Sequence, residues 1–155
     1  MTNSDVQDAL YLDDFFVGQR FEARGEYPLD TETIRRFASE YDPQPFHTDD
    51  EAAKDSFFRG LAASGWQVAS LTMKLLVESG PKIAGGMIGA GGEIAWPQPT
   101  RPGDVLRVTS EVLAVKPSRS KPDRGFATVR HESRNQNGEL LQTFTVNMLV
   151  FRRPD

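Results

Sequence analysis

Residues 64–80 read SGWQVASLTMKLLVESG and form the longest helix candidate of the chain. Apolar residues occur on nearly every side of this helix, and only Lys74 and Glu78 are charged. A helix that is apolar all round is typical of a buried position, so a sheet wrapped around it is the simplest arrangement. The first four residues fit a capping box, and Gly80, followed by proline, marks the end. We therefore expect a buried helix over residues 64–78.

The rest of the chain favours strands. Residues 106–112 alternate between apolar and polar side chains, as in a strand with one buried face. The Asn-Gly pair at 137–138 predicts a hairpin turn. Strands are expected over residues 20–27, 87–96, 106–112, 125–135 and 140–150. A further helix is expected over residues 31–41, capped by Asp30. Because turns join most of these strands, we expect an antiparallel sheet and an α+β fold.

The composition is that of an ordinary globular domain of 155 residues, 38% of them hydrophobic and 26% charged. The absence of cysteine excludes disulfides, thiolate metal sites and cysteine nucleophiles. The net charge of −4 argues against general nucleic-acid binding. No stretch is apolar enough to cross a bilayer, and residues 1–10 are unlike a signal peptide. We expect a flexible terminus over residues 1–10 and a cytoplasmic protein without membrane partners.

The residues best suited to chemistry lie in the stretch 37–53, which reads FASEYDPQPFHTDDEAA. Asp42 and His47 lie five positions apart, with two prolines between them. Proline fixes φ and biases the residue before it towards extended geometry. We therefore expect a stiff, non-helical loop that holds an acid and an imidazole. A capping box at residues 48–51, with the cap at its first residue, predicts that the next helix starts just after His47.

Gly65 supplies a third candidate group. If Ser64 caps the long helix, the N–H of Gly65 is an unpaired donor at the positive end of the helix dipole. Glycine has no side chain that would block close approach. An acid, an imidazole and a bare backbone donor can together activate a water and hold an oxyanion. The alternative is structural, because an Asp and a His in a loop are more often solvated or capping residues.

The string DPQPFHTD at residues 42–49, followed by Ala-Ser-Gly at 63–65 and a long apolar helix, resembles the MaoC-like dehydratases. These are the (R)-specific enoyl-CoA hydratases of the hotdog superfamily, and the resemblance covers nearly the whole chain. It implies a single hotdog domain over residues 11–155, with an antiparallel sheet wrapped around one long buried helix. It also implies a homodimer.

The same resemblance implies a reaction, the reversible addition of water to a trans-2-enoyl thioester. Asp42 and His47 would hold the water, and the Gly65 N–H would stabilise the thioester oxygen. Coenzyme A would enter as part of the substrate, with no separate cofactor. Related hydratases often have a histidine where Ser64 stands and a serine where Met73 stands, which leaves the preferred acyl chain open.

Six residues are candidates for contacts with the substrate. Ser64 and Trp66 stand at the helix start, and Phe57 could line a substrate entrance or simply pack over the core. The loop at residues 116–124 has the densest positive charge of the chain. Its cations could bind the phosphates of coenzyme A, or the loop could be a solvated hairpin. The cations concerned are Arg119, Lys121 and Arg124.

A metal site, a dinucleotide site and a different thioester function are the other interpretations of this sequence. His131 lies on an apolar strand face, which favours a hydrogen-bonded core histidine, and no metal site is expected. Residues 85–92 are glycine-rich but lack the strand–GxGxxG–helix context of a dinucleotide site. An acyl-CoA thioesterase or a non-catalytic acyl-thioester-binding protein remains an alternative function. Thioesterases of this superfamily generally have a carboxylate on the long helix or its facing strand; residues 64–77 contain none, and Glu93 remains a candidate.

Overall fold

The computed structural model describes residues 8–155 of the chain. The flexible terminus expected over residues 1–10 lies outside the described residues at positions 1–7. Leu10 is already held by the folded part, because its N–H donates to the Lys82 carbonyl at 2.8 Å and it forms a parallel bridge with Ile83. The folded part therefore includes Leu10.

In the described part of the chain, one antiparallel sheet forms the body of the molecule. Its strand order is β1-β4-β5-β6-β3, and β2 also pairs with β4. The strands are β1 (Arg20–Glu22), β2 (Tyr27–Pro28), β3 (Ile88–Ala95), β4 (Val105–Pro117), β5 (Arg124–Arg134) and β6 (Leu140–Phe151). The tight turn at Gly138, where φ is 76°, joins β5 to β6 as the Asn-Gly pair predicts. The expected α+β class and antiparallel sheet are confirmed.

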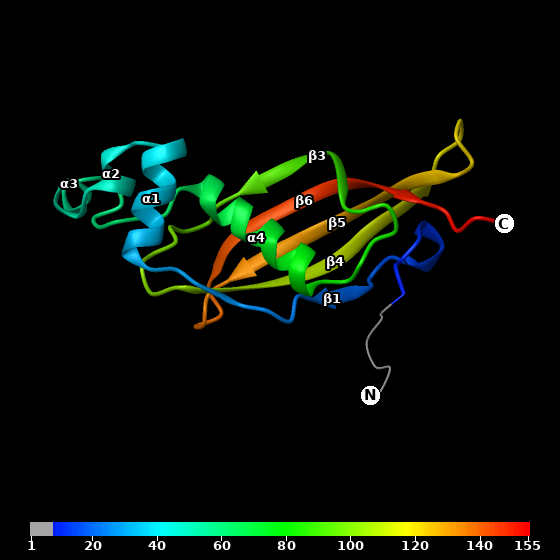
Figure 1. The fold of residues 1–155 in the computed structure, drawn as a ribbon, viewed down its shortest axis with the longest axis horizontal. Coiled ribbons are helices and arrows are strands. Elements are labelled where there is room, and N and C mark those ends of the chain that lie inside the picture. The colour runs from blue at the N-terminus through cyan, green and yellow to red at the C-terminus, as the bar shows by residue number, and fades with distance from the viewer. Residues whose placement is uncertain (1–7) are drawn as a thin grey trace.

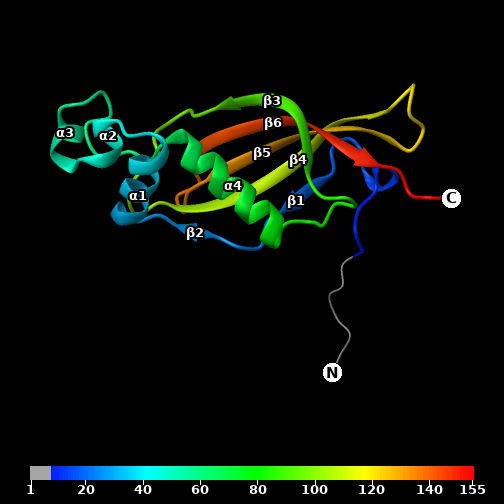
Figure 2. The same cartoon turned by 45° about the horizontal axis from the view of Figure 1, so that its top comes forward.

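Within residues 8–155, five helical segments accompany the sheet. They are η1 (Leu12–Asp14), α1 (Thr31–Tyr41), α2 (Pro45–Thr48), α3 (Asp50–Lys54) and α4 (Gly65–Ser79). The long helix α4 lies across one face of the curved sheet (Figure 1, Figure 2). The short helices α1, α2 and α3 gather at one end of the molecule, and the β4–β5 hairpin projects from the other end (Figure 1).

The long helix is buried on one side only. Val68, Leu75 and Leu76 face the core and are at most 4% exposed, whereas Trp66 is 60% exposed and Val77 is 62% exposed. The prediction of a long helix packed on a sheet is confirmed, but burial on all sides is not found in the single chain. The reason is geometric, since the sheet passes along one side of α4 and leaves its outer apolar stripe open.

The strand expected over residues 20–27 is split into β1 and β2. Between them, the N–H of Arg24 donates to the carbonyl of Ser79 at 3.1 Å, and the N–H of Gly25 donates to the Ser79 hydroxyl at 3.0 Å. The chain therefore turns away from β4 between β1 and β2 and covers the C-terminal end of α4. These contacts satisfy groups at the helix end that alternation in the sequence cannot reveal.

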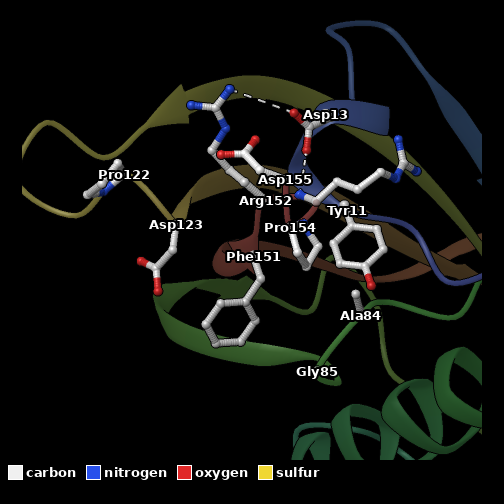
Figure 3. Close-up of a pocket in the computed structure, with 11 residues that line it drawn as sticks. Tyr11, Asp13, Ala84, Gly85, Pro122, Asp123, Phe151, Arg152, Pro154 and Asp155 are labelled. Atoms are coloured by element: carbon white, nitrogen blue, oxygen red, sulfur yellow. Dashed lines mark hydrogen bonds and ion pairs between the residues drawn. The ribbon is translucent and has the colours of Figure 1, made fainter.

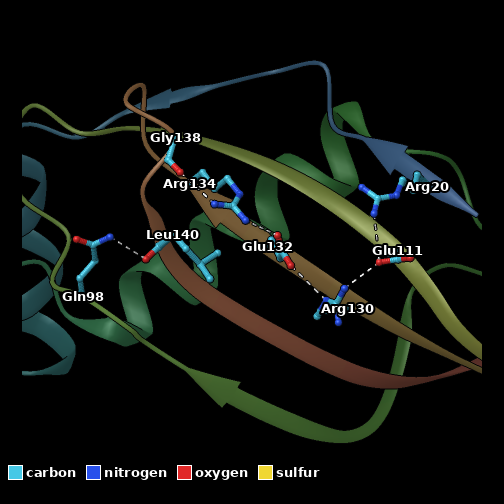
Figure 4. A network of polar contacts seen from close by, with 8 residues as sticks. All are labelled: Arg20, Gln98, Glu111, Arg130, Glu132, Arg134, Gly138 and Leu140. Atoms are coloured by element: carbon cyan, nitrogen blue, oxygen red, sulfur yellow. Dashed lines mark hydrogen bonds and ion pairs between the residues drawn. The ribbon is translucent and has the colours of Figure 1, made fainter. Parts of the chain in front are cut away.

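The two faces of the sheet differ in character. The face towards α4 is apolar and contains His131, which is 3% exposed and shares a hydrogen bond of 2.7 Å with Ser110, as expected for a core histidine. The opposite face has alternating charges across β1, β4 and β5 (Figure 4). Glu111, for example, pairs with Arg130 at 2.8 Å. The second face is therefore a polar surface and contributes no apolar wall to a binding site.

Within residues 8–155, none of the helices combines the length and the apolar character that a bilayer crossing requires.

Candidate active site

The end of α1 places Asp42. The N–H of Asp42 donates to the Ala38 carbonyl at 2.8 Å, and Asp42 itself has φ −152° and ψ 67°, outside helical geometry. The proline that follows disfavours helical geometry at Asp42 and so ends the helix there. The carboxylate is thereby fixed at the C-terminal cap of α1, as the sequence predicts.

The histidine lies in a short helix and not in a non-helical loop. Pro45 is the first residue of α2, which extends to Thr48 and contains His47. Proline is tolerated in the first turn of a helix, where its missing N–H would have no helical partner. The expectation of an irregular loop is wrong because the proline signal fits a helix start as well as a loop.

The next helix begins one residue later than the capping box predicts. Asp49, and not Thr48, caps α3, and its carboxylate accepts from Glu51 N–H at 2.9 Å and from Ala52 N–H at 3.3 Å. The Thr48 hydroxyl instead donates back to the carbonyl of Gln44 at 3.2 Å. Two adjacent residues could each cap this helix, and the turn of α2 decides which of them does.

The acid and the imidazole meet. Nε2 of His47 lies 3.2 Å from Oδ2 of Asp42, and the two side chains are 7% and 17% exposed. Nδ1 of His47 lies 2.6 Å from the carbonyl oxygen of Ala62. Because a carbonyl oxygen can only accept, Nδ1 must be the protonated donor in this bond. Nε2 is therefore the ring atom that can exchange a proton beside the carboxylate.

Two further side chains fix the carboxylate. The Gln44 amide donates to Oδ1 of Asp42 at 2.6 Å, and the Ser64 hydroxyl donates to Oδ2 at 2.8 Å. Burial raises the pKa of Asp42, but the bonds from Gln44 and Ser64 and the charge and hydrogen bond of His47 outweigh burial. The net effect holds the pKa of Asp42 below its usual value, so this group is a carboxylate at neutral pH.

Gly65 is the first residue of α4, and Ser64 is its cap, as predicted. The Ser64 hydroxyl oxygen accepts from Trp66 N–H at 3.3 Å. Among residues 8–155, the Gly65 N–H makes no hydrogen bond. Because the Ser64 hydroxyl also reaches Asp42, the free amide at the helix start adjoins the acid–imidazole pair.

Trp96 packs directly over Gly65. A Cβ added to Gly65 would lie 2.5 Å from Cε2 of this indole ring. The Trp96 N–H donates to the Gln142 amide oxygen at 2.9 Å, and Gln142 in turn donates to the hydroxyl of Thr72 at 3.1 Å. Gln142 is completely buried, so the indole is held in place. The sequence shows no local signal for this packing.

The two aromatic candidates lie differently relative to the site. Phe57 is 94% exposed and packs edge-on against Phe58, its ring centroid 5.5 Å away. Phe58 is the residue that approaches the site, with its ring centroid 6.1 Å from that of His47. Trp66 is 60% exposed and stacks edge-on with Trp96 at 5.7 Å. Trp66 therefore borders the site, whereas Phe57 contacts it only through its neighbour.

The basic loop lies far from the acid–imidazole pair of its own chain. Residues 118–123 form the tip of the β4–β5 hairpin, at the opposite end of the molecule from α1 and α2 (Figure 1). Arg119 and Lys121 are exposed there, while Arg124 pairs with Asp123 at 2.9 Å and lies over the ring of Phe151. One chain therefore does not bring these cations to Asp42.

An open pocket of about 690 Å³ lies at the base of that hairpin (Figure 3). Tyr11, Asp123, Phe151 and Arg152 are among its lining residues. Its arginines already have acidic neighbours, since Arg152 lies 3.7 Å from Asp13 and Arg153 contacts Asp14 at 2.8 Å. The pocket shares no residue with the acid–imidazole pair and has no histidine in its lining.

A metal centre has no support in the described part of the chain. Within residues 8–155, no group of three or more His, Asp or Glu side chains could hold a metal ion. Asp42 and His47 are also engaged with each other and with Ser64, Gln44 and the Ala62 carbonyl.

Comparison with known proteins assigns the chain to a family. Residues 14–135 match the MaoC like domain. A solved MaoC-like dehydratase from Rhodospirillum rubrum is 52% identical, with a TM-score of 0.92 over 95% of this chain and 100% of that one. An (R)-hydratase from A. caviae involved in PHA biosynthesis is 25% identical, with a TM-score of 0.66 over 91% of this chain and 98% of that one.

A relative among curated proteins, the uncharacterised YdeM of Bacillus subtilis, is 37% identical over 82% of this chain and 89% of its own length. The family match covers most of the chain, and both solved structures superpose on nearly all of it. The chain therefore belongs to the MaoC-like domain family, and its fold is the hotdog fold.

Proposed function

We propose that this protein is an (R)-specific enoyl-CoA hydratase, or 3-hydroxyacyl-CoA dehydratase in the reverse direction. The observation that carries the proposal is the contact of 3.2 Å between Asp42 and His47, joined through Ser64 to the helix start at Gly65. Family membership supports a dehydratase, and the arrangement of these groups supports water addition to a thioester.

Asp42 and His47 bind the reacting water in this mechanism. Oδ2 and Nε2 are close enough for a single water to contact both of them. The water oxygen forms a bond to Cβ of the enoyl thioester, and one of its protons passes to the pair. The pair returns a proton to Cα, so water is added across the double bond and the enzyme ends unchanged.

Gly65 stabilises the negative charge that develops during this step. As the oxygen adds to Cβ, charge accumulates on the thioester carbonyl oxygen. A fixed backbone N–H aimed at such an oxygen is worth about 3–4 kcal/mol of transition-state stabilisation. Coenzyme A is part of the substrate in this reaction, and the side chains need no separate cofactor.

A second copy of the chain completes the proposed assembly. β3 pairs with β6 alone, so its other edge has no strand partner among residues 8–155. The outer face of α4 also exposes apolar side chains, among them Met73 and Val77, which are 41% and 62% exposed. An open sheet edge and an exposed apolar stripe favour a two-fold homodimer that covers both.

The test mixes the protein with crotonyl-CoA and with longer enoyl-CoAs. Absorbance of the conjugated thioester and release of free thiol are followed together. Loss of conjugation without thiol release supports hydration, and the stereochemistry of the 3-hydroxyacyl product then decides the (R) assignment. Thiol release would identify a thioesterase instead, and no change with any chain length would contradict the proposal.

The structure gives the thioesterase alternative no catalytic carboxylate on α4. The only acid of that helix is Glu78, which lies near its C-terminal end and pairs with Lys74 at 2.6 Å. Glu93 lies on β3 with an exposed side chain. Hydration therefore remains the function that the site supports best.

A further inference from the structure

The Ser64 side chain contacts both the Asp42 carboxylate and the first turn of α4. It has no exposed surface, although it adjoins partly exposed catalytic groups. Its hydroxyl oxygen lies 2.8 Å from Oδ2 of Asp42 and 3.3 Å from the backbone nitrogen of Trp66. Because the side chain is fully enclosed by these contacts, it has no free face for a substrate.

The direction of the two hydrogen bonds can be assigned from their partners. The Trp66 N–H can only donate, so the Ser64 oxygen accepts there and acts as the helix cap. The Asp42 carboxylate can only accept when ionised, so the single hydroxyl proton of Ser64 must point to Oδ2. One small side chain therefore links the carboxylate at the end of α1 to the first turn of α4.

We propose that Ser64 is a positioning residue that fixes the Asp42 carboxylate relative to the Gly65 amide. The inference rests on the proposed function, because this relative position matters for the reaction only if both groups act on one thioester. Asp42 belongs to α1 and Gly65 to α4, and Ser64 adjoins Gly65 in the chain while bonding to Asp42. Loss of the hydroxyl removes one hydrogen bond to Oδ2, which still lies 3.2 Å from Nε2 of His47, and leaves the backbone of α4 in place.

Ser64 also affects the ionisation of Asp42. The groups that face this carboxyl are His47 from α2, Gln44 from the α1–α2 connection, and Ser64 from the start of α4. His47 is the titratable member of this set, and the other two are neutral donors. Removing the Ser64 donor while burial persists makes the charged form less favourable, so Asp42 titrates at a higher pH.

The experiment compares Ser64→Ala and Ser64→Gly with the wild type and with Asp30→Ala. Asp30 caps α1 through a bond of 2.7 Å to Thr33 N–H and does not touch Asp42, so it reports the loss of a cap alone. Glycine is a better helix cap than alanine, which keeps the test open if Ser64→Ala folds poorly. Circular dichroism and thermal melting establish that each variant is folded.

Both Ser64 variants should lower kcat for crotonyl-CoA roughly tenfold to a hundredfold, with KM nearly unchanged. The acidic limb of their kcat profile should move to higher pH, whereas Asp30→Ala should keep the wild-type profile. A wild-type profile in folded Ser64→Ala and Ser64→Gly would overturn the inference. So would an equal loss of kcat in Asp30→Ala, because Ser64 would then act only as a cap.

A measurement that needs no activity separates this inference from the proposed function. The Asp42 carboxyl carbon is titrated by ¹³C NMR in the wild type and in the Ser64 variants. A titration that moves to higher pH in the variants supports the Ser64 contact even if the wild type hydrates no enoyl-CoA. An unchanged titration overturns the positioning role even if the wild type is an active hydratase.

Discussion

The Cα of Gly65 packs against the indole ring of Trp96 so closely that no side chain fits between them. An added Cβ would lie 2.5, 2.7 and 2.9 Å from three carbons of that ring. The ring cannot easily move away, because its N–H is bonded at 2.9 Å to the completely buried Gln142. The proposed oxyanion donor and the wall beside it are therefore fixed relative to each other.

Gly65→Ala is expected to destabilise the protein by about 1–3 kcal/mol, the usual effect of forcing an extra methyl group into a packed site. It should also abolish hydration, since relief of the clash displaces the amide. Urea denaturation and the crotonyl-CoA assay measure the two effects. In Gly65→Ala/Trp96→Ala the clash is removed, so the extra destabilisation caused by Gly65→Ala should disappear. If this extra destabilisation persists when Trp96 is alanine, the indole ring is not its cause.

Asp42→Asn and His47→Ala are each expected to lower kcat for crotonyl-CoA by about a hundredfold or more. Asparagine keeps the shape of the acid and can still accept from Ser64, so its loss of activity would report the missing charge. Because the two groups act on one water, the double variant should lose far less than the product of the single losses. Thermal melting shows whether each variant is folded, and full activity in either single variant would overturn the site assignment.

Most of the confirmed predictions rest on local rules. The cap at Ser64, the end of α1 before a proline and the hairpin at residues 137–138 each depend on residues within one turn of each other. Pairing of Asp42 with His47 was expected from family resemblance, and the structure brings them to 3.2 Å. Local sequence rules therefore predicted the helix ends and the hairpin, whereas the family resemblance predicted the pairing of Asp42 with His47.

The features that sequence reasoning missed depend on tertiary contacts or on ambiguous local signals. Trp96 and Gln142 come from the end of β3 and from β6, and nothing in their own segments indicates that they pack behind Gly65. The bond from the Ser64 hydroxyl to Asp42 was not predicted either, because Asp42 belongs to the end of another helix. His47 was assigned to a loop because a proline signal does not distinguish a loop from the first turn of α2.

Stability should depend on pH through His131. Burial lowers the pKa of His131 from 6.5 to about 4. Between these values the unfolded chain binds a proton that the folded chain does not, so stability falls as the pH falls. This group alone should remove about 2 kcal/mol of unfolding free energy between pH 7.5 and pH 5. Urea denaturation at both values measures the loss.

His131→Gln provides the control for this pH dependence. Glutamine is neutral at every pH in this range and can still share a hydrogen bond with Ser110. The variant should lose about 2 kcal/mol less than the wild type between pH 7.5 and pH 5. Equal losses in both proteins would show that His131 does not titrate in this window. Asp42 does not interfere, because its lowered pKa places its own loss of stability below the usual Asp pKa, at about pH 4 and lower.

The proposed homodimer can be tested on the outer stripe of α4. Val77 is 62% exposed in the single chain, and Val17, between η1 and β1, is 65% exposed. Val77→Glu and Val17→Glu therefore place the same charge at nearly equal exposure, and both should fold, because neither valine is buried within the chain. Only Val77→Glu places its carboxylate on the stripe proposed to be covered by a second copy, where removing an unpaired charge from water is costly.

Sedimentation velocity should show that Val77→Glu is monomeric or dissociates at higher protein concentration, while Val17→Glu stays dimeric like the wild type. A dimer of unchanged strength in Val77→Glu would place the interface elsewhere, and a monomeric wild type would contradict the proposed assembly.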